Sequence, residues 1–163
     1  MICVPGKPNY KQIKIQTRCG NDIDNRQVLD FSASELNSIP DYSKDYKRVW
    51  FRNKPNPIYN CHGMTFACAR TWVGPECVQT ILDDDGYTEI EKLDDVLPGD
   101  VIIYYDDNGE ILHSGIVVSK PKDELTRFPW VVSKWGKYSE AYHPGYDVPY
   151  RPIAKVSFWR ITK

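Results

Sequence analysis

The sequence predicts an α+β domain in which a short helical region is followed by a run of antiparallel strands. A helical apolar pattern begins at Cys61 and stops at Gly74-Pro75, and strand-like segments follow from Asp100 onward. Two of these segments are joined by "DDNG" at 106–109, and Asn-Gly is the favoured pair for a tight hairpin turn. Helices segregated from antiparallel strands are typical of α+β domains, in which the helices pack on one side of a sheet.

The composition is that of an ordinary globular protein. The chain has 163 residues, of which 41% are hydrophobic and 26% are charged, and one domain is the natural expectation. The formal net charge of −1 argues against a nucleic-acid partner, and no apolar run is long enough to cross a membrane. No secretory signal is visible at the start, so we expect a cytoplasmic protein or one exported by a route without such a signal.

Residues 1–55 differ in character from the rest. We expect them to form an N-terminal extension packed on a main domain of residues 56–163, because so short a segment would have a weak core alone. The expected elements of the extension are a strand over 11–19, a turn at 20–22, a returning strand over 26–32 and a short helix over 32–38 that ends before Pro40.

The main domain is expected to begin with a helix over 61–73, since Cys61, Thr65, Cys68 and Trp72 share one helical face. Thr88 and Glu91 have capping-box spacing and predict a second short helix through Val96. The predicted strands cover 100–105, 110–119, 130–135 and 154–161.

The strand over 110–119 is apolar on both faces, which is typical of a central, buried strand. Strict alternation places His113 on the face shared by Ile111, Gly115 and Val117. An imidazole in such a place is largely removed from water, and it is expected either to be satisfied by a partner or to be used chemically.

The sequence gives no reason to expect a metal or a cofactor. Five cysteines occur without any C-x-x-C spacing, so a structural zinc site is not expected, and the odd count leaves at least one free thiol. The acidic stretch over 83–91 does not fit a calcium-binding loop, because Ile81 and Lys92 would occupy ligand positions. It is expected to be a solvated turn.

Cys61 is the main candidate for chemistry. It lies at the expected start of a helix, where unpaired N–H groups lower the pKa of a thiol and can hold an oxyanion. Gly63 would leave room for a substrate to approach. The local sequence equally allows a small buried hydrophobic side chain, and the two interpretations remain open at this point.

A nucleophilic cysteine needs a base, and the three histidines are the candidates. His62 follows Cys61 directly and would point about 100° away on a helix, so it is expected to line the cleft. His143 is expected in an exposed loop. His113 is the best candidate because of its place in the apolar strand.

The order "NCHGMTFA", "LPGDVIIYY" and "HSGIVV" resembles the papain-like cysteine hydrolases over about residues 58–135. The nearest branch is that of the NlpC-type cell-wall peptidases and their CHAP-type relatives. The resemblance implies a papain-like fold, with an N-terminal helix that carries the cysteine packed on an antiparallel β-sheet. It also implies that Cys61 is the nucleophile and His113 the general base.

In this family a third polar group on the next strand orients the imidazole. That strand is "WVVSKW", where Ser133 is the only uncharged polar residue, and His143 is the alternative if its loop folds back.

Asn60 is expected to cap the helix and to help the oxyanion site, together with His62 and Gly63. Lys134 would be solvated or would pair with a substrate carboxylate. The aromatic stretch over 133–150 would line a groove or pack under a loop.

The expected activity is therefore hydrolysis of an amide bond by a Cys–His dyad or triad without a cofactor. By resemblance, the first expected substrate is the peptidoglycan stem peptide, and the protein would be a lysin or an antibacterial effector, with an immunity protein as partner in the latter case. Two alternatives remain: a papain-like deamidase, acyltransferase or protease that acts on a host protein, and a non-catalytic binding module.

Overall fold

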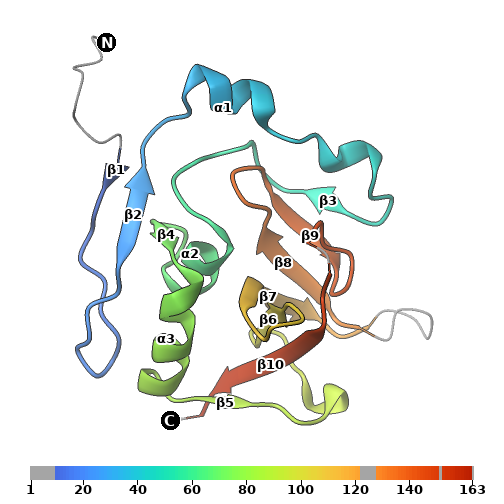
Figure 1. Cartoon of the computed structure of the whole chain (residues 1–163). Helices are drawn as coiled ribbons and strands as arrows, with labels where there is room; N and C mark the ends of the chain where they lie inside the picture. Colours follow the sequence, from blue (N-terminus) through green and yellow to red (C-terminus); the bar gives the residue numbers. More distant parts are fainter. Residues whose placement is uncertain (1–9, 122–127, 151, 163) are drawn as a thin grey trace.

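The computed structural model describes residues 10–121, 128–150 and 152–162. They form two antiparallel sheets and three short α-helices, which confirms the α+β class (Figure 1). The strands are β1 (Tyr10–Lys11), β2 (Asn25–Val28), β3 (Trp50–Phe51), β4 (Trp72–Val73), β5 (Tyr87–Glu89), β6 (Val101–Tyr105), β7 (Ile111–Ser119), β8 (Trp130–Lys134), β9 (Glu140–Pro144) and β10 (Lys155–Ile161). The α-helices are α1 (Ala33–Ser38), α2 (Cys61–Phe66) and α3 (Val78–Asp84), and three 3₁₀ turns cover Tyr42–Lys44, Pro75–Cys77 and Leu93–Asp95.

The large sheet has seven strands in the order β3-β9-β8-β7-β6-β10-β5. Its middle strand is β7, so the prediction of a central strand is confirmed. The small sheet has the order β1-β2-β4. Helix α2 packs on β7 and β8, which places the residue at its start, Cys61, beside the centre of the large sheet.

The β6–β7 hairpin forms as its sequence predicts. Gly109 has a φ of 82°, and the Asp106 carboxylate accepts hydrogen bonds from the N–H groups of Asn108 and Glu110. A β-bulge lies in this hairpin, because Tyr104 pairs with His113 whereas Tyr105 pairs with Ile111. The extra residue, Leu112, puts Ile111 on the opposite face of the sheet from His113. The prediction that Ile111 and His113 share one face is therefore wrong.

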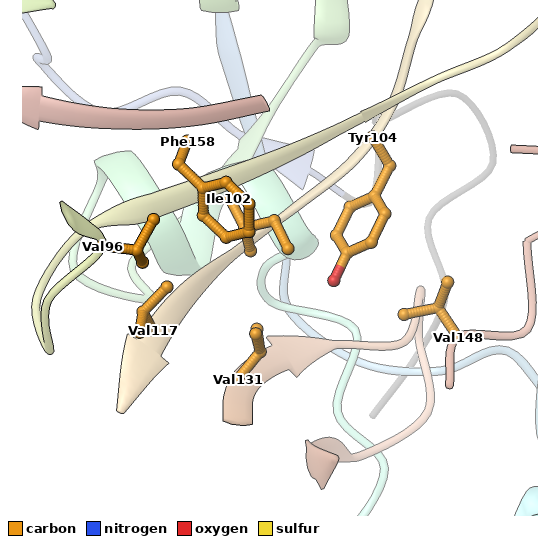
Figure 2. Close-up of a cluster of buried hydrophobic side chains, with 7 residues drawn as sticks. All are labelled: Val96, Ile102, Tyr104, Val117, Val131, Val148 and Phe158. Carbon is orange, nitrogen blue, oxygen red and sulfur yellow. The ribbon is translucent and has the colours of Figure 1, made fainter. Parts of the chain in front are cut away.

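Each face of the large sheet has its own core. One face carries Ile102 and Tyr104 of β6 in a cluster that also contains Val96, Val117, Val131, Val148 and Phe158 (Figure 2). The other face carries Val101 and Ile103 and packs against Val78 and Leu82 of α3. His113 pairs directly with Tyr104 and therefore belongs to the first face.

The turn "LPGD" is held to the last strand by an ion pair. The Asp100 carboxylate accepts from Arg160 at both oxygens, with N–O distances of 2.7 Å each, and also from the N–H of Leu97 at 2.6 Å. Asp100 is only 2% exposed. Asp100 of the "LPGD" turn therefore has a structural role: it attaches the start of β6 to β10.

The expected helix over 61–73 ends early, at Phe66. Cys68 and Ala69 have φ values of 51° and 58°, and the carbonyl of Gly63 accepts from the N–H groups of both Ala67 and Ala69. The chain then turns into β4, which pairs with β2. Cys68 and Trp72 therefore do not continue the helical face of Cys61.

Three further expectations need correction. The stretch over 88–96 forms β5 and a 3₁₀ turn instead of a capped helix, because β5 pairs with the edge of β10. Helix α3 lies where no helix was expected. His143 lies on β9 rather than in an exposed loop, and it is fully buried.

Residues 10–55 contribute to both sheets. The strand expected over 11–19 is regular only at β1, with an isolated bridge between Gln16 and Asp22, whereas the helix expected over 32–38 forms as α1 with a capping box between Ser32 and Glu35. Strand β2 pairs with β4 and β3 pairs with β9, so pairing crosses the expected boundary at residue 55 twice.

The acidic stretch that begins at the end of α3 binds the N-terminal segment as well as solvent. The Asp84 carboxylate accepts from Thr17 and Asn21, and Asp85 accepts from the N–H of Arg18. The expectation of a purely solvated turn is therefore wrong at Asp84 and Asp85.

Candidate active site

Asn60 caps helix α2 as expected. Its side-chain oxygen accepts from the N–H of Gly63 at 2.8 Å and from the N–H of Val73 at 3.1 Å, and its amide donates to the Val73 carbonyl at 2.8 Å. The cap therefore also fastens β4 to the start of α2. The part expected of Asn60 in oxyanion binding stays a prediction.

The Cys61 thiol lies at the first turn of α2 and is nearly buried, with 6% of the residue exposed. Burial raises its pKa to about 11, although the backbone N–H groups of Ser114, His62 and Cys61 itself act in the opposite direction. The expected lowering of the thiol pKa is therefore wrong for this structure, because the loss of water outweighs the N–H groups. These N–H groups nevertheless converge on the sulfur from two elements, α2 and β7.

Gly63 does not leave room for a substrate. A Cβ at this position would lie 1.7 Å from the carbonyl oxygen of Thr71. The glycine is therefore required because the segment before β4 crosses α2 in direct backbone contact.

His113 is fully buried on β7, and neither ring nitrogen has a hydrogen-bond partner within the described part of the chain. Its ring lies close to two tyrosine rings, at centroid distances of 5.3 Å to Tyr104 and 4.6 Å to Tyr150. Burial holds the pKa of His113 well below its ordinary value, and His62 and His143 act in the same direction. The imidazole is thus neutral at pH 7, and one of its nitrogens is a free acceptor.

His62 is connected to the backbone of Cys61 by a chain of hydrogen bonds. The carbonyl of Cys61 can only accept, so Thr65 donates to it at 2.9 Å, Ser114 donates to Thr65 at 3.1 Å, and His62 Nδ1 donates to Ser114 at 2.9 Å. Because His62 is 2% exposed, it lies in the interior and does not line an open cleft as expected. Its Nε2 carries no proton in this arrangement, and burial lowers the pKa of His62 to about 4.

The structure brings together the two candidates for the third group, Ser133 and His143, but it pairs them with each other. His143 Nδ1 donates to the Pro144 carbonyl at 2.8 Å, so its Nε2 accepts from the Ser133 hydroxyl at 2.8 Å. Ser133 also accepts from the indole N–H of Trp135 at 3.1 Å. Burial lowers the pKa of His143 to about 4, so this pair is neutral. Neither residue hydrogen-bonds His113 in this structure.

Burial decides two further expectations, against a solvated Lys134 and in favour of a packed aromatic stretch at Trp135. Lys134 is fully buried rather than solvated. Trp135 is 2% exposed and packs edge-on against Tyr42, Tyr46 and Phe51, so the start of the aromatic stretch packs under the N-terminal segment and does not line a groove.

Tyr150, which no sequence pattern singled out, contacts His113 from an irregular segment after β9. Burial raises the pKa of Tyr150, and the charge of Cys61 acts in the same direction, which places the phenol near both candidate residues. No periodic pattern marks such a position. Ser114 was not predicted either; it faces α2, where its hydroxyl is hydrogen-bonded to Thr65 and His62.

Within residues 10–121, 128–150 and 152–162, no group of three or more metal-binding side chains occurs. Cys19, Cys61, Cys68 and Cys77 are free thiols, and Cys3 lies outside the described residues. No helix in the described part of the chain is long and apolar enough to cross a membrane.

Comparison with known proteins gives no match: no family model, curated protein or solved structure matches this chain.

Proposed function

We propose that this chain is a cysteine hydrolase that cleaves an amide bond, with Cys61 as nucleophile and His113 as general base. The observation that carries the proposal is the state of His113, which is fully buried with both ring nitrogens unpartnered in the described structure. A buried imidazole without partners is costly, and such groups are concentrated at sites that use them. The next residue on β7, Ser114, directs its N–H toward the Cys61 thiol.

In the proposed reaction, His113 removes the proton from the Cys61 thiol as the sulfur attacks the substrate carbonyl. Because the thiol pKa is raised and that of His113 is lowered, both groups start neutral, so proton transfer accompanies the attack. The N–H groups of Cys61, His62 and Ser114 then stabilise the oxyanion. The protonated His113 gives its proton to the leaving amine, and water hydrolyses the acyl-enzyme.

For the substrate class we propose peptidoglycan stem peptides. This part rests on the resemblance of "NCHGMTFA", "LPGDVIIYY" and "HSGIVV" to cell-wall peptidases. The protein would then be a lysin or an antibacterial effector, and an immunity protein would be a partner in the second case.

The second candidate function is a non-catalytic binding module. The observation that favours it is the raised pKa of Cys61, about 11, which describes a buried thiol that is inert at neutral pH. In that case, His113 is a core residue held by Tyr104 and Tyr150.

The test is digestion of purified peptidoglycan with the wild-type protein, Cys61→Ser and His113→Gln, with the products read by mass spectrometry. We expect new stem-peptide fragments from the wild type and none from either variant. Cys68→Ser is the matched control, because Cys68 is a free thiol on the same stretch but is exposed, and this variant should digest as the wild type does.

Alkylation by iodoacetamide separates the two candidate functions without a substrate. A catalytic dyad requires that the alkylation rate of Cys61 falls in His113→Gln, because the base that removes the thiol proton is gone. If the rate is unchanged in that variant and peptidoglycan is not cut, the binding module is the correct interpretation.

A further inference from the structure

Ser114 of β7 is attached to α2 through both its side chain and its backbone. Its hydroxyl lies 2.9 Å from Nδ1 of His62 and 3.1 Å from the hydroxyl of Thr65, and both partners belong to α2. Strand β8 pairs with β7 from Ile116 onward, and before that point the N–H of Ser114 is directed at the sulfur of Cys61. One residue of the central strand is therefore fixed to the helix at two points.

The carbonyl of Cys61 sets the direction of every hydrogen bond in this chain. That oxygen can only accept, so the Thr65 hydroxyl gives its proton to it, at 2.9 Å. Thr65 then has only lone pairs left for Ser114, and Ser114 in turn has only lone pairs left for His62. The chain therefore ends on a ring N–H, and His62 must carry a proton on Nδ1.

Burial makes this arrangement of protons the favourable one. Ser114 has no exposed surface and His62 is 2% exposed, so solvent cannot supply a missing partner. If the proton of the neutral ring were on Nε2, the lone pair of Nδ1 would face the lone pairs of the Ser114 oxygen. A buried polar group left without its hydrogen bond is costly, so the structure selects the Nδ1–H form of His62.

The same hydrogen bonds limit the movement of the groups around the sulfur. A hydrogen bond weakens steeply when its donor moves out of line, so the N–H of Ser114 stays on Cys61 only while Ser114 keeps its place. Ser114 directly follows His113 on β7, and its attachment to α2 therefore also restrains the backbone of the proposed base. A side chain that merely filled space at position 62 would supply neither restraint.

We propose that His62 is a positioning residue, which keeps the backbone N–H of Ser114 on the Cys61 sulfur. It acts through the hydroxyls of Ser114 and Thr65, and the proposal rests on the proposed function of Cys61 as nucleophile. During attack the thiol proton passes to a ring nitrogen of His113, whereas the Nδ1 proton of His62 stays where it is. The contribution of His62 is that the N–H of Ser114 is already in place when negative charge develops.

The first test compares His62→Leu, which has no donor, with His62→Asn, whose amide nitrogen is bonded to Cγ as Nδ1 is. The rate of Cys61 alkylation by iodoacetamide is measured at about pH 9, below the thiol pKa of about 11, where the rate follows the thiolate fraction. Mass spectrometry reads the site of labelling, and the exposed thiol of Cys68 is the internal reference. We expect the rate to fall about tenfold in His62→Leu and to return nearly to the wild-type value in His62→Asn.

A space-filling role for His62 gives the opposite sign. A loosened core would expose the thiol, and Cys61 would then label faster in His62→Leu. A rate equal to or above that of the wild type in this variant, or a rate that His62→Asn does not restore, would overturn the proposal.

The second test leaves His62 unchanged and therefore also serves if His62→Leu does not fold. Thr65→Val removes the hydroxyl that accepts from Ser114, so Ser114 gives its proton to Nδ1 instead and the ring carries its own proton on Nε2. Long-range ¹H–¹⁵N NMR correlations of the ring should show Nδ1–H in the wild type and Nε2–H in Thr65→Val. Thr80→Val, at an exposed position of α3, is the matched control and should keep the wild-type tautomer.

An Nε2–H ring in the wild-type protein, or an unchanged tautomer in Thr65→Val, would refute the chain on which the positioning depends. Neither test depends on cleavage, so failure to digest peptidoglycan would count against the proposed function alone.

Discussion

The ring of Tyr150 packs on the imidazole of His113, with 4.6 Å between the ring centroids and 34° between the ring planes. Tyr104 packs on the same imidazole at 5.3 Å. The orientation of His113 is therefore set by aromatic contacts, and neither ring nitrogen has a hydrogen-bond partner in the described part of the chain. The side chains expected for that task, Ser133 and His143, are occupied with one another.

This contact predicts that Tyr150→Leu raises the pKa of His113 toward its ordinary value of 6.5, because water gains access to the ring. Tyr150→Phe keeps the ring contact and should leave the pKa of His113 low. An NMR titration of the histidine ring protons measures the pKa of His113 in the two variants. Equal shifts in the two variants would show that the hydroxyl, and not the ring, matters.

The three buried histidines predict that stability falls in mild acid. Burial lowers the folded-state pKa of His62 and His143 to about 4 and that of His113 well below 6.5, whereas the unfolded chain binds protons near 6.5. The unfolded state therefore binds more protons as the pH falls, so the free energy of unfolding decreases from pH 6.5 toward pH 4. Each histidine contributes about 1.4 kcal/mol per pH unit in this window.

Urea unfolding at several values of pH between 4.5 and 6.5 measures this slope. His143→Gln should reduce the slope by about one third, because one of three similar contributions is removed. A stability that does not change across this window would contradict the neutral, buried state of these side chains.

Gly63→Ala should be among the most damaging single changes in the protein. The added methyl group would meet the Thr71 carbonyl, and relief requires that β4 move away from α2. We expect a loss of more than about 4 kcal/mol or a failure to fold. Gly109→Ala is the control, since a Cβ there meets nothing and the cost is only that of its φ of 82°, about 1 kcal/mol. Similar thermal unfolding of the two variants would argue against the close crossing.

The ion pair between Asp100 and Arg160 gives a further prediction. Asp100→Ala leaves the Leu97 N–H without its acceptor and the guanidinium without its partner, so the free energy of unfolding should fall by about 2 kcal/mol. Lys155 and Glu89 form an exposed pair on neighbouring strands, and Glu89→Ala should cost less than about 1 kcal/mol. Chemical denaturation of the two variants compares them directly.

Four strands of the large sheet, β6, β7, β8 and β10, could be predicted because their patterns are local. The hairpin around Gly109 is specified by its own turn residues, and the apolar character of β7 on both faces indicated its central place. Strand β9 could not be found this way, since "EAYHP" contains a proline and reads as a loop. It is a strand because it pairs with β8 along its whole length.

The candidate site was predicted in part. Cys61 at the start of α2 and His113 on β7 are both buried, but their environment depends on residues distant in sequence. The pKa of the thiol is set by burial, and burial results from how the whole chain packs. Tyr150 and Ser114 act through contacts with segments far from them in the sequence, and a pattern along the sequence carries no trace of such contacts.

The bulge at Leu112 has a consequence for protein engineering. It absorbs one residue between the tip of the β6–β7 hairpin and His113, so insertions in the turn at 106–109 can be tolerated while the pairing of His113 with Tyr104 is kept. Deletion of Leu112, in contrast, would remove the bulge. It would return the hairpin to strict alternation, and either the outer part of β7 or His113 itself would have to exchange faces. The hairpin tip is thus a suitable place for a fluorescent label or an affinity tag, whereas the two residues before His113 are not.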